Sequence, residues 1–168
     1  MRLRAAAGQD RGRASGSDRS RAVRSVSPGQ ADAAVVRRHL LALDGAVQQL
    51  RHHAGRPLSA LAADSDTQWA VERGLQLCAQ NALDVATHLA ASAGRDTPDY
   101  ASAVDVLGEL GVLPTAFAHR FRGVAGFRNV LVHGDLRVEL ERVHELLNAG
   151  LDDFAEFARH VERFLQRS

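Results

Sequence analysis

The chain has little cysteine, few aromatic residues and no long apolar run. Cys78 is the only cysteine among 168 residues, which excludes an intramolecular disulfide and any multi-cysteine metal site. No apolar run approaches the roughly 20 residues that a membrane-spanning helix needs, so we expect a soluble protein, and the cysteine usage fits the cytoplasm. Aromatic residues make up 5% of the chain and hydrophobic residues 45%. This length and composition suit one domain with an aliphatic core.

Lysine is absent, since all 21 basic residues are arginine, and the arginines are unevenly distributed. Seven of them fall within the first 24 residues, beside only Asp10 and Asp18. The remaining 14 arginines face 18 acids, a balance of 14 − 18 = −4, so the body is not a generally basic nucleic-acid binder. Residues 1–26 hold too few large apolar side chains to offset the entropy of ordering. We therefore expect a disordered Arg-rich tail over 1–26 and a helical domain over 27–168.

Three explanations of the tail stay open. Its Arg- and Ser-rich, acid-poor composition resembles an organellar transit peptide, but the tail lacks amphipathic periodicity. An overextended gene start or a solvated extension is the simpler explanation. The functional alternative is an electrostatic arm that contacts RNA.

The periodicity of the body predicts helices and shows no strand alternation. Ser27-Pro28-Gly29-Gln30 has the residues of a capping box, which predicts a long helix that ends at Gly55. Thr97-Pro98 predicts the cap and first residue of a shorter helix, which ends at Gly108 or Gly111. The other predicted helical segments have apolar residues at steps of three and four, and cover 58–62, about 66–93, about 114–133, and about 137–165 with a break at Gly150. The expected fold class is an all-α bundle of about five helices.

Several single residues have simple structural explanations. Cys78 lies on the apolar stripe of the second long helix and is expected to be a small buried hydrophobe rather than a nucleophile. Tyr100, the only tyrosine, is predicted on an apolar helix face in a structural role. His52-His53 could suggest a metal ligand pair, but adjacent histidines point in different directions and no third ligand is evident, so a contact with the helix C-terminus is favoured. We predict no metal and no cofactor.

The predicted helix over 114–133 carries an unusual set of polar residues. The stretch from Gly111 to Gly134 contains no acid, and its basic residues are His119, Arg120, Arg122, Arg128 and His133. At about 100° per residue, Arg128 falls near the centre of the apolar stripe, whereas Arg122, Asn129 and His133 share another face. Burying an unpaired guanidinium costs several kcal/mol, so Arg128 is expected to meet an anionic group.

Two explanations of these residues compete. In the structural one, Arg128 pairs with a carboxylate of another helix, and His133 is favoured at a helix C-terminus by the helix dipole. In the functional one, Arg128 holds a phosphate and His133 moves a proton, which is the minimum equipment for metal-free RNA cleavage. Spacing alone does not decide between them.

A family resemblance favours the functional explanation. Residues 128–133, RNVLVH, have the form R-x4-H, and the surrounding RGVAGFRNVLVHG, residues 122–134, resembles the signature of HepT-like toxins of the HEPN superfamily. The segments 71–86 and 100–114 are similar to the family's second and third helices. The resemblance covers about residues 31–167.

The resemblance implies a helical HEPN fold that forms a homodimer, with the R-x4-H residues of both subunits lining a shared cleft. It implies a metal-independent endoribonuclease toxin of a toxin–antitoxin pair, whose antitoxin is a small nucleotidyltransferase. Arg128 would bind the scissile phosphate of the RNA substrate and His133 would transfer protons. Asn129 would orient the imidazole or the phosphate. Arg122 would contact neighbouring phosphates or be an ordinary surface residue.

The sequence departs from the family pattern at one position. Many members have a tyrosine two residues after the histidine, which the partner is thought to adenylylate, whereas this chain has Asp135 there. Neutralisation would then proceed by direct binding or through another hydroxyl, or the chain is a divergent member. The alternative function is a non-catalytic HEPN-like binding module that partners a nucleotidyltransferase, because Asp135 could repel substrate phosphate.

Overall fold

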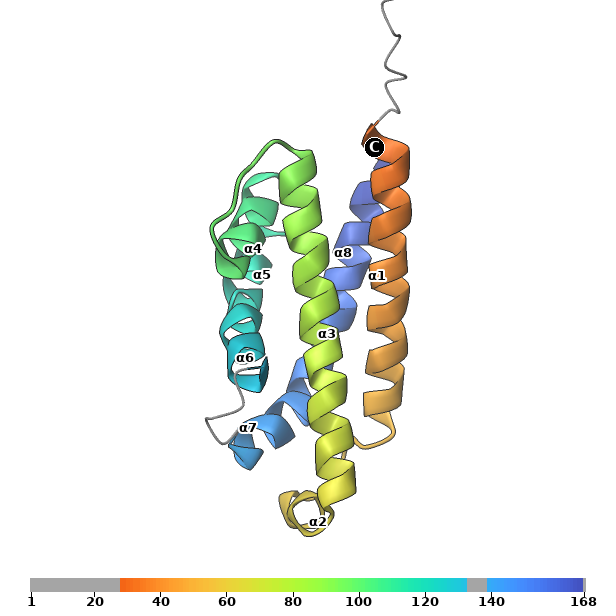
Figure 1. The fold of residues 1–168 in the computed structure, drawn as a ribbon, viewed down its shortest axis with the longest axis vertical. Coiled ribbons are helices and arrows are strands. Elements are labelled where there is room, and N and C mark those ends of the chain that lie inside the picture. Colours follow the sequence, from red (N-terminus) through yellow and green to blue (C-terminus); the bar gives the residue numbers. More distant parts are fainter. Residues whose placement is uncertain (1–27, 133–138, 168) are drawn as a thin grey trace, which may run out of the picture.

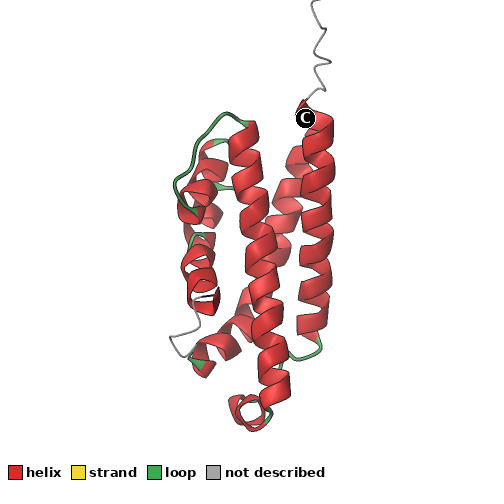
Figure 2. Cartoon of the chain, in the orientation of Figure 1, coloured by secondary structure: helices red, strands yellow, loops and turns green. Residues whose placement is uncertain are grey.

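The structure is a computed structural model that describes residues 28–132 and 139–167, and within these two ranges all regular elements are helices (Figure 2). The elements are α1 (Pro28–Arg51), α2 (Leu58–Ala63), α3 (Ser65–Ser92), α4 (Tyr100–Glu109), α5 (Thr115–Phe121), α6 (Gly123–Val132), α7 (Leu140–Glu145), a π-helical turn η1 (Leu146–Gly150) and α8 (Leu151–Arg167). The predicted all-α bundle is confirmed. The predicted tail and the cap at Ser27 lie outside the described residues. No helix of the described part is long and apolar enough to cross a membrane.

Helix α3 is the centre of the bundle. It contacts α1, α4, α6 and α8. Figure 1 shows α1 and α8 on one side of α3, and α4, α5 and α6 on the other. The segment that carries the R-x4-H arginine therefore packs on the side of α3 opposite to α1.

The core follows the predicted apolar stripes. All positions predicted for the stripes of α1 and α3 are at most 7% exposed: Val36, Leu40, Leu43, Val47, Leu50, Val71, Leu75, Cys78, Ala82, Val85 and Leu89. Burial raises the pKa of the Cys78 thiol to about 12, which confirms its role as a buried hydrophobe. Gly55 and Gly111, two of the glycines predicted to end helices, have φ angles of 80° and 70°, and Gly94 after α3 has a φ of 71°, a conformation that favours glycine.

Four of the six phenylalanines join α5 to α8. The ring of Phe121 stacks on Phe157 at 4.8 Å between centroids and meets Phe154 edge-on at 5.7 Å. Phe117 stacks on Phe121 at 5.3 Å. This aromatic cluster fixes the helix that leads directly into α6.

The predicted start of α4 at Thr97-Pro98 is wrong. The helix begins at Tyr100, and its N-cap is Asp99, whose carboxylate accepts hydrogen bonds from the Ser102 amide and hydroxyl, both at 2.7 Å. An aspartate that satisfies a free helix amide in this way is a strong cap, so the helix starts two residues later than the Thr-Pro pair indicated. Asp64 caps α3 in the same manner, through the Thr67 amide at 3.0 Å.

The predicted helix over about 114–133 is divided in two. Helix α5 ends at Phe121 and α6 begins at Gly123, although Arg122 between them keeps helical angles of φ −52° and ψ −31°. Glycine at 123 and 126 lowers helix propensity by up to about 1 kcal/mol each, which weakens continuity here. The break predicted at Gly150 is instead the end of the π-helical turn η1, from which α8 continues directly.

Candidate functional site

Arg128 lies on α6, partly buried, where α6 meets α3 and α4. Its Nε donates a hydrogen bond to Oε1 of Gln80 on α3 at 3.1 Å. Its guanidinium carbon lies 5.2 Å from the centroid of the Tyr100 ring, at the first residue of α4. A neutral amide and an aromatic face therefore hold this cation in one orientation.

Gln80 connects Arg128 to two further side chains. Its Nε2 donates to Oδ1 of Asp84 at 2.6 Å and to the Tyr100 hydroxyl at 3.3 Å. The amide therefore presents its oxygen to the guanidinium and its nitrogen to the carboxylate, which is the only orientation that suits both partners. The negative charge of Asp84 reaches Arg128 through this amide and not by direct contact.

The structural explanation, in which a carboxylate of another helix pairs with Arg128, finds no such carboxylate within the described residues, and the phosphate explanation stays a prediction. No carboxylate of residues 28–132 or 139–167 forms an ion pair with Arg128, whose described partners are Gln80, Tyr100 and Asn129. The residue is only partly buried, which lowers the cost of leaving its charge without a carboxylate.

The other arginines of this segment are paired with carboxylates. Arg122, 53% exposed, forms an ion pair with Asp105 of α4 at 3.0 Å. Arg120 pairs with Asp153 at 3.2 Å and with Glu156 at 3.3 Å, both on α8. Acids of other helices therefore neutralise two of the three arginines in this acid-free stretch of sequence. Arg128 is the arginine of this stretch that pairs with no carboxylate of residues 28–132 or 139–167.

Of the remaining predicted site residues that the structure describes, Asn129 lies beside Arg128, whereas Arg122 contacts another residue. Asn129 is exposed beside Arg128, and its Oδ1 lies 3.5 Å from an Nη of Arg128, the upper limit of a hydrogen bond. Arg122 faces Asp105 rather than the Arg128 network. His133 and Asp135 lie outside the described residues, so the predicted roles of both stay predictions.

Sequence reasoning missed Gln80, Asp84 and the polar contacts of Tyr100. Tyr100 packs against the hydrophobic core, as predicted, but in addition its ring covers Arg128 and its hydroxyl accepts from Gln80. A signal was present on α3, where Gln80 and Asp84 are four residues apart and form one polar row. What the row would meet depended on how α3, α4 and α6 pack.

The described histidines form no metal site. No group of three or more His, Cys, Asp or Glu side chains in the described part could hold a metal ion. Nδ1 of His52 lies 3.3 Å from the Gln49 carbonyl near the end of α1, the contact predicted for it. His39 hydrogen bonds Asn81 at 2.9 Å, and His144 hydrogen bonds the Arg56 carbonyl at 2.8 Å.

A family model matches the part of the chain that holds this network. Residues 43–161 match the model described as ribonuclease HepT-like. The chain belongs to the HepT-like family. Gln80, Asp84, Tyr100 and Arg128 all lie within the matched range of this HepT-like chain. No curated protein matches the chain at a significant level.

Solved structures with the same fold are HEPN toxins crystallised with antitoxins. The tri-AMPylated Shewanella oneidensis HEPN toxin in complex with MNT antitoxin superposes with a TM-score of 0.69, at 18% identity over 77% of this chain and 97% of that one. A toxin–antitoxin structure with AMP-PNP gives 0.69 at 18% identity, over 77% and 98%. A mutant MntA-HpeT toxin–antitoxin gives 0.67 at 19% identity, over 77% and 98%. These likenesses establish that the HepT-like chain has the HEPN toxin fold.

Proposed function

We propose that this HepT-like chain is a metal-independent endoribonuclease toxin, which cleaves RNA through attack of the ribose 2′-hydroxyl on the adjacent phosphate. The observation that carries the proposal is the Arg128 guanidinium, which neutral groups orient while its charge stays unpaired with any described carboxylate. A structural arginine would gain more from a direct carboxylate partner. An oriented and unpaired guanidinium is suited to an incoming phosphate.

The contacts of Arg128 leave its outer edge for substrate. Gln80 occupies Nε, and the weak contact to Asn129 involves a single Nη atom. The two Nη groups can then donate to two oxygens of the scissile phosphate and stabilise the charge that develops on them. Tyr100 and Gln80 act as positioning residues, because they set the direction of the guanidinium.

His133 supplies the proton transfers in this proposal. It removes the proton of the 2′-hydroxyl or donates one to the leaving 5′-oxygen, a role worth about 10²- to 10⁴-fold in rate. The 2′-oxygen forms a bond to phosphorus as the bond to the 5′-oxygen breaks, which leaves a 2′,3′-cyclic phosphate and a 5′-hydroxyl. No metal and no cofactor takes part. Asn129 orients the imidazole or the phosphate, and Arg122 contacts a neighbouring phosphate by exchanging its exposed pair with Asp105.

The proposed assembly is a homodimer with the R-x4-H residues of two subunits lining one cleft. The proposed partner is a small nucleotidyltransferase antitoxin, as in the toxin–antitoxin complexes that share the fold. One of those toxins is tri-AMPylated. Since Asp135 replaces the expected tyrosine and lacks a hydroxyl, we propose that the antitoxin neutralises this chain by direct binding or through another hydroxyl.

Cleavage in the presence of EDTA tests the enzyme proposal. The purified chain should cleave RNA to a 2′,3′-cyclic phosphate, and His133→Ala should lower the rate by about 10²-fold or more while RNA binding is largely kept. Arg128→Ala should weaken both binding and cleavage, because the guanidinium contacts the phosphate in the ground state and the transition state. Arg38→Ala, an exposed arginine of α1, is the matched control and should retain activity.

The second candidate function is a non-catalytic HEPN-like binding module, which the carboxylate of Asp135 near His133 in sequence favours. It predicts RNA or antitoxin binding with no EDTA-resistant cleavage above that of His133→Ala. That outcome would replace the toxin proposal.

A further inference from the structure

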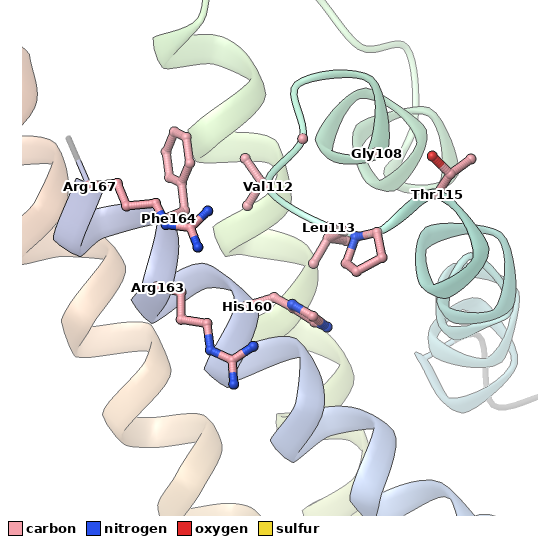
Figure 3. Close-up of a pocket in the computed structure, with 10 residues that line it drawn as sticks. Gly108, Val112, Leu113, Thr115, His160, Arg163, Phe164 and Arg167 are labelled. Carbon is pink, nitrogen blue, oxygen red and sulfur yellow. The ribbon is translucent and has the colours of Figure 1, made fainter.

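A cavity lined by arginines lies between the end of α8 and the turn that joins α4 to α5. Its volume is about 440 Å³. One side is formed by α8 side chains spaced three or four residues apart: His160, Arg163, Phe164 and Arg167. The opposite wall is the apolar run Val112, Leu113 and Pro114, with Thr115 beside it (Figure 3).

In the described part of the chain, the two arginines of this cavity pair with no carboxylate, and Glu156 contacts only the histidine among the lining residues. No acidic residue lines the cavity within the described part of the chain. Arg163 and Arg167 are exposed, and neither forms an ion pair with a described carboxylate, in contrast to Arg120 and Arg122. His160 is held in place by Glu156 at 3.4 Å and by the Phe117 ring at 5.3 Å. Two arginines one helical turn apart thus face the cavity from α8 without a described carboxylate partner.

The cavity is separate from the Arg128 network. The two share no residue, since the network comprises Gln80, Asp84, Tyr100 and Arg128 with Asn129 at its edge. In Figure 1 the C-terminal end of α8 and the helix α6 lie at different levels of the bundle. A ligand in the cavity would therefore leave Arg128 accessible.

We propose that this cavity binds a nucleotide, with its phosphate on Arg163 and Arg167 and its base against the wall of Val112 to Pro114. Paired guanidinium groups suit phosphate oxygens, because their planar forks match the phosphate geometry. The volume lies in the range of small-molecule sites, and an apolar wall beside a few polar groups is their usual lining. A free mononucleotide and a nucleotide of an RNA strand share this chemistry. The proposal concerns binding alone and does not depend on ribonuclease activity.

The test measures binding of AMP, adenosine, inorganic phosphate and a 2′-O-methyl RNA oligonucleotide, which cannot be cleaved through its 2′ position, to the full chain. Arg163→Ala with Arg167→Ala should weaken binding of AMP, of the oligonucleotide or of both by about tenfold or more. Arg37→Ala with Arg38→Ala removes the same charge from exposed positions on α1 that pair with no described carboxylate, and should change either affinity by about twofold or less.

A charge placed in the cavity provides a second variant that leaves both arginines intact. Thr115→Glu adds a carboxylate to the lining of the cavity, on the side away from the two arginines (Figure 3), and should weaken binding because it repels a phosphate in the same cavity. An acid in the first turn of α5 is compatible with the helix. Ala116→Glu, at the next exposed position and not lining the cavity, is its control and should bind as the native chain does.

The outcomes separate the sources of the ligand. Loss confined to the oligonucleotide assigns the cavity to an RNA strand, and loss confined to AMP assigns it to free nucleotide. Equal losses in the cavity variants and their controls overturn the proposal. The proposal is also overturned if inorganic phosphate binds as tightly as AMP, because the base would then contribute nothing to binding. It is overturned equally if adenosine binds as tightly as AMP, because the phosphate would then contribute nothing.

Discussion

At the scale of single residues, the informative feature is that neutral groups hold Arg128. Gln80 satisfies its Nε, and Tyr100 covers one face of the guanidinium. A carboxylate in either place would neutralise the charge with which Arg128 is proposed to bind a phosphate. The Gln80 amide instead fixes the direction of the guanidinium and keeps its charge available, with Asp84 fixing the amide in turn.

The first prediction removes this support. Gln80→Ala frees the Nε of Arg128 and should lower the rate of RNA cleavage by about tenfold, as is typical when a group that orients a site residue is lost. Stability should fall by only about 1 kcal/mol, the usual net value of one hydrogen bond. Single-turnover cleavage and thermal unfolding measure the two effects.

Gln76→Ala is the matched control, since Gln76 lies one turn earlier on α3 and bonds Arg73 instead. It should leave cleavage unchanged. Equal activity of Gln80→Ala and Gln76→Ala would show that Gln80 does not position Arg128.

The R-x4-H motif pointed to Arg128 from sequence alone, but Gln80 and Tyr100 could not be recognised in this way. Their contact with Arg128 depends on how three helices pack, and residues 48 and 28 positions away in the chain have no local signal of this contact. The pairing of Arg120 and Arg122 was hidden for the same reason, because their carboxylate partners lie on α8 and α4. An acid-free stretch of sequence is therefore no measure of local charge in the fold.

At the scale of helices, apolar spacing and glycine stops predicted the long elements well, because each depends on nearby residues. The errors occur where a stronger local group competes. Asp99 displaced Thr97-Pro98 as the cap of α4, since its carboxylate accepts both the amide and the hydroxyl of Ser102. The π-helical turn before Gly150 had no clear signal in the spacing.

The cap at Asp99 leads to a pH prediction. The hydrogen bond from the Ser102 amide has the largest effect on the pKa of Asp99, followed by the hydrogen bond from the Ser102 hydroxyl. Both lower this pKa below the ordinary value of 3.8. Because the pKa of Asp99 is lower in the folded chain than in the unfolded chain, its ionised carboxylate stabilises the fold at pH values above the ordinary pKa. This stabilisation is lost as the pH falls through the pKa of the folded chain. Asp99→Asn keeps a capping oxygen but does not titrate. The melting temperature of the native chain should exceed that of Asp99→Asn at neutral pH, and the difference should vanish toward acid. A difference independent of pH would contradict this account.

The crossing of α1 and α3 leads to a second prediction about helices. A Cβ at Gly74 would lie 2.6 Å from Cδ2 and 2.9 Å from Cγ of the buried Leu50. Gly74→Ala should therefore destabilise the fold by about 1–2 kcal/mol, because overpacking outweighs the gain in helix propensity. Gly45→Ala on α1 meets nothing within 4 Å and should stabilise by about 0.5–1 kcal/mol. Denaturant unfolding of both variants checks the opposite signs.

At the scale of the whole molecule, the outer face of α6 bears on the proposed homodimer. Gly123, Gly126, Asn129 and Val130 are exposed, and a Cβ at either glycine would meet nothing within 4 Å. Another helix could approach this face closely, because small residues let two backbones come together. Asn129 of the R-x4-H segment lies on this face, whereas Arg128 points to α3 and α4 on the other side of the helix. A second subunit docked here would still bring two R-x4-H segments close together.

Light scattering on the purified chain should therefore show a dimer at micromolar concentration, with at least roughly 1,000 Å² buried in total. Gly126→Gln should shift the mass toward the monomer, because the longer side chain holds the two α6 helices apart, whereas nothing within its own subunit obstructs it. Gly45→Gln, also exposed and unobstructed but on α1, should remain dimeric. If RNA cleavage needs the shared cleft, Gly126→Gln should lose it in proportion to the loss of dimer, and raising the protein concentration should restore both together. A native chain that stays monomeric at these concentrations would contradict the proposed homodimer. A monomeric variant that cleaves RNA at the native rate would show that one subunit holds the whole site.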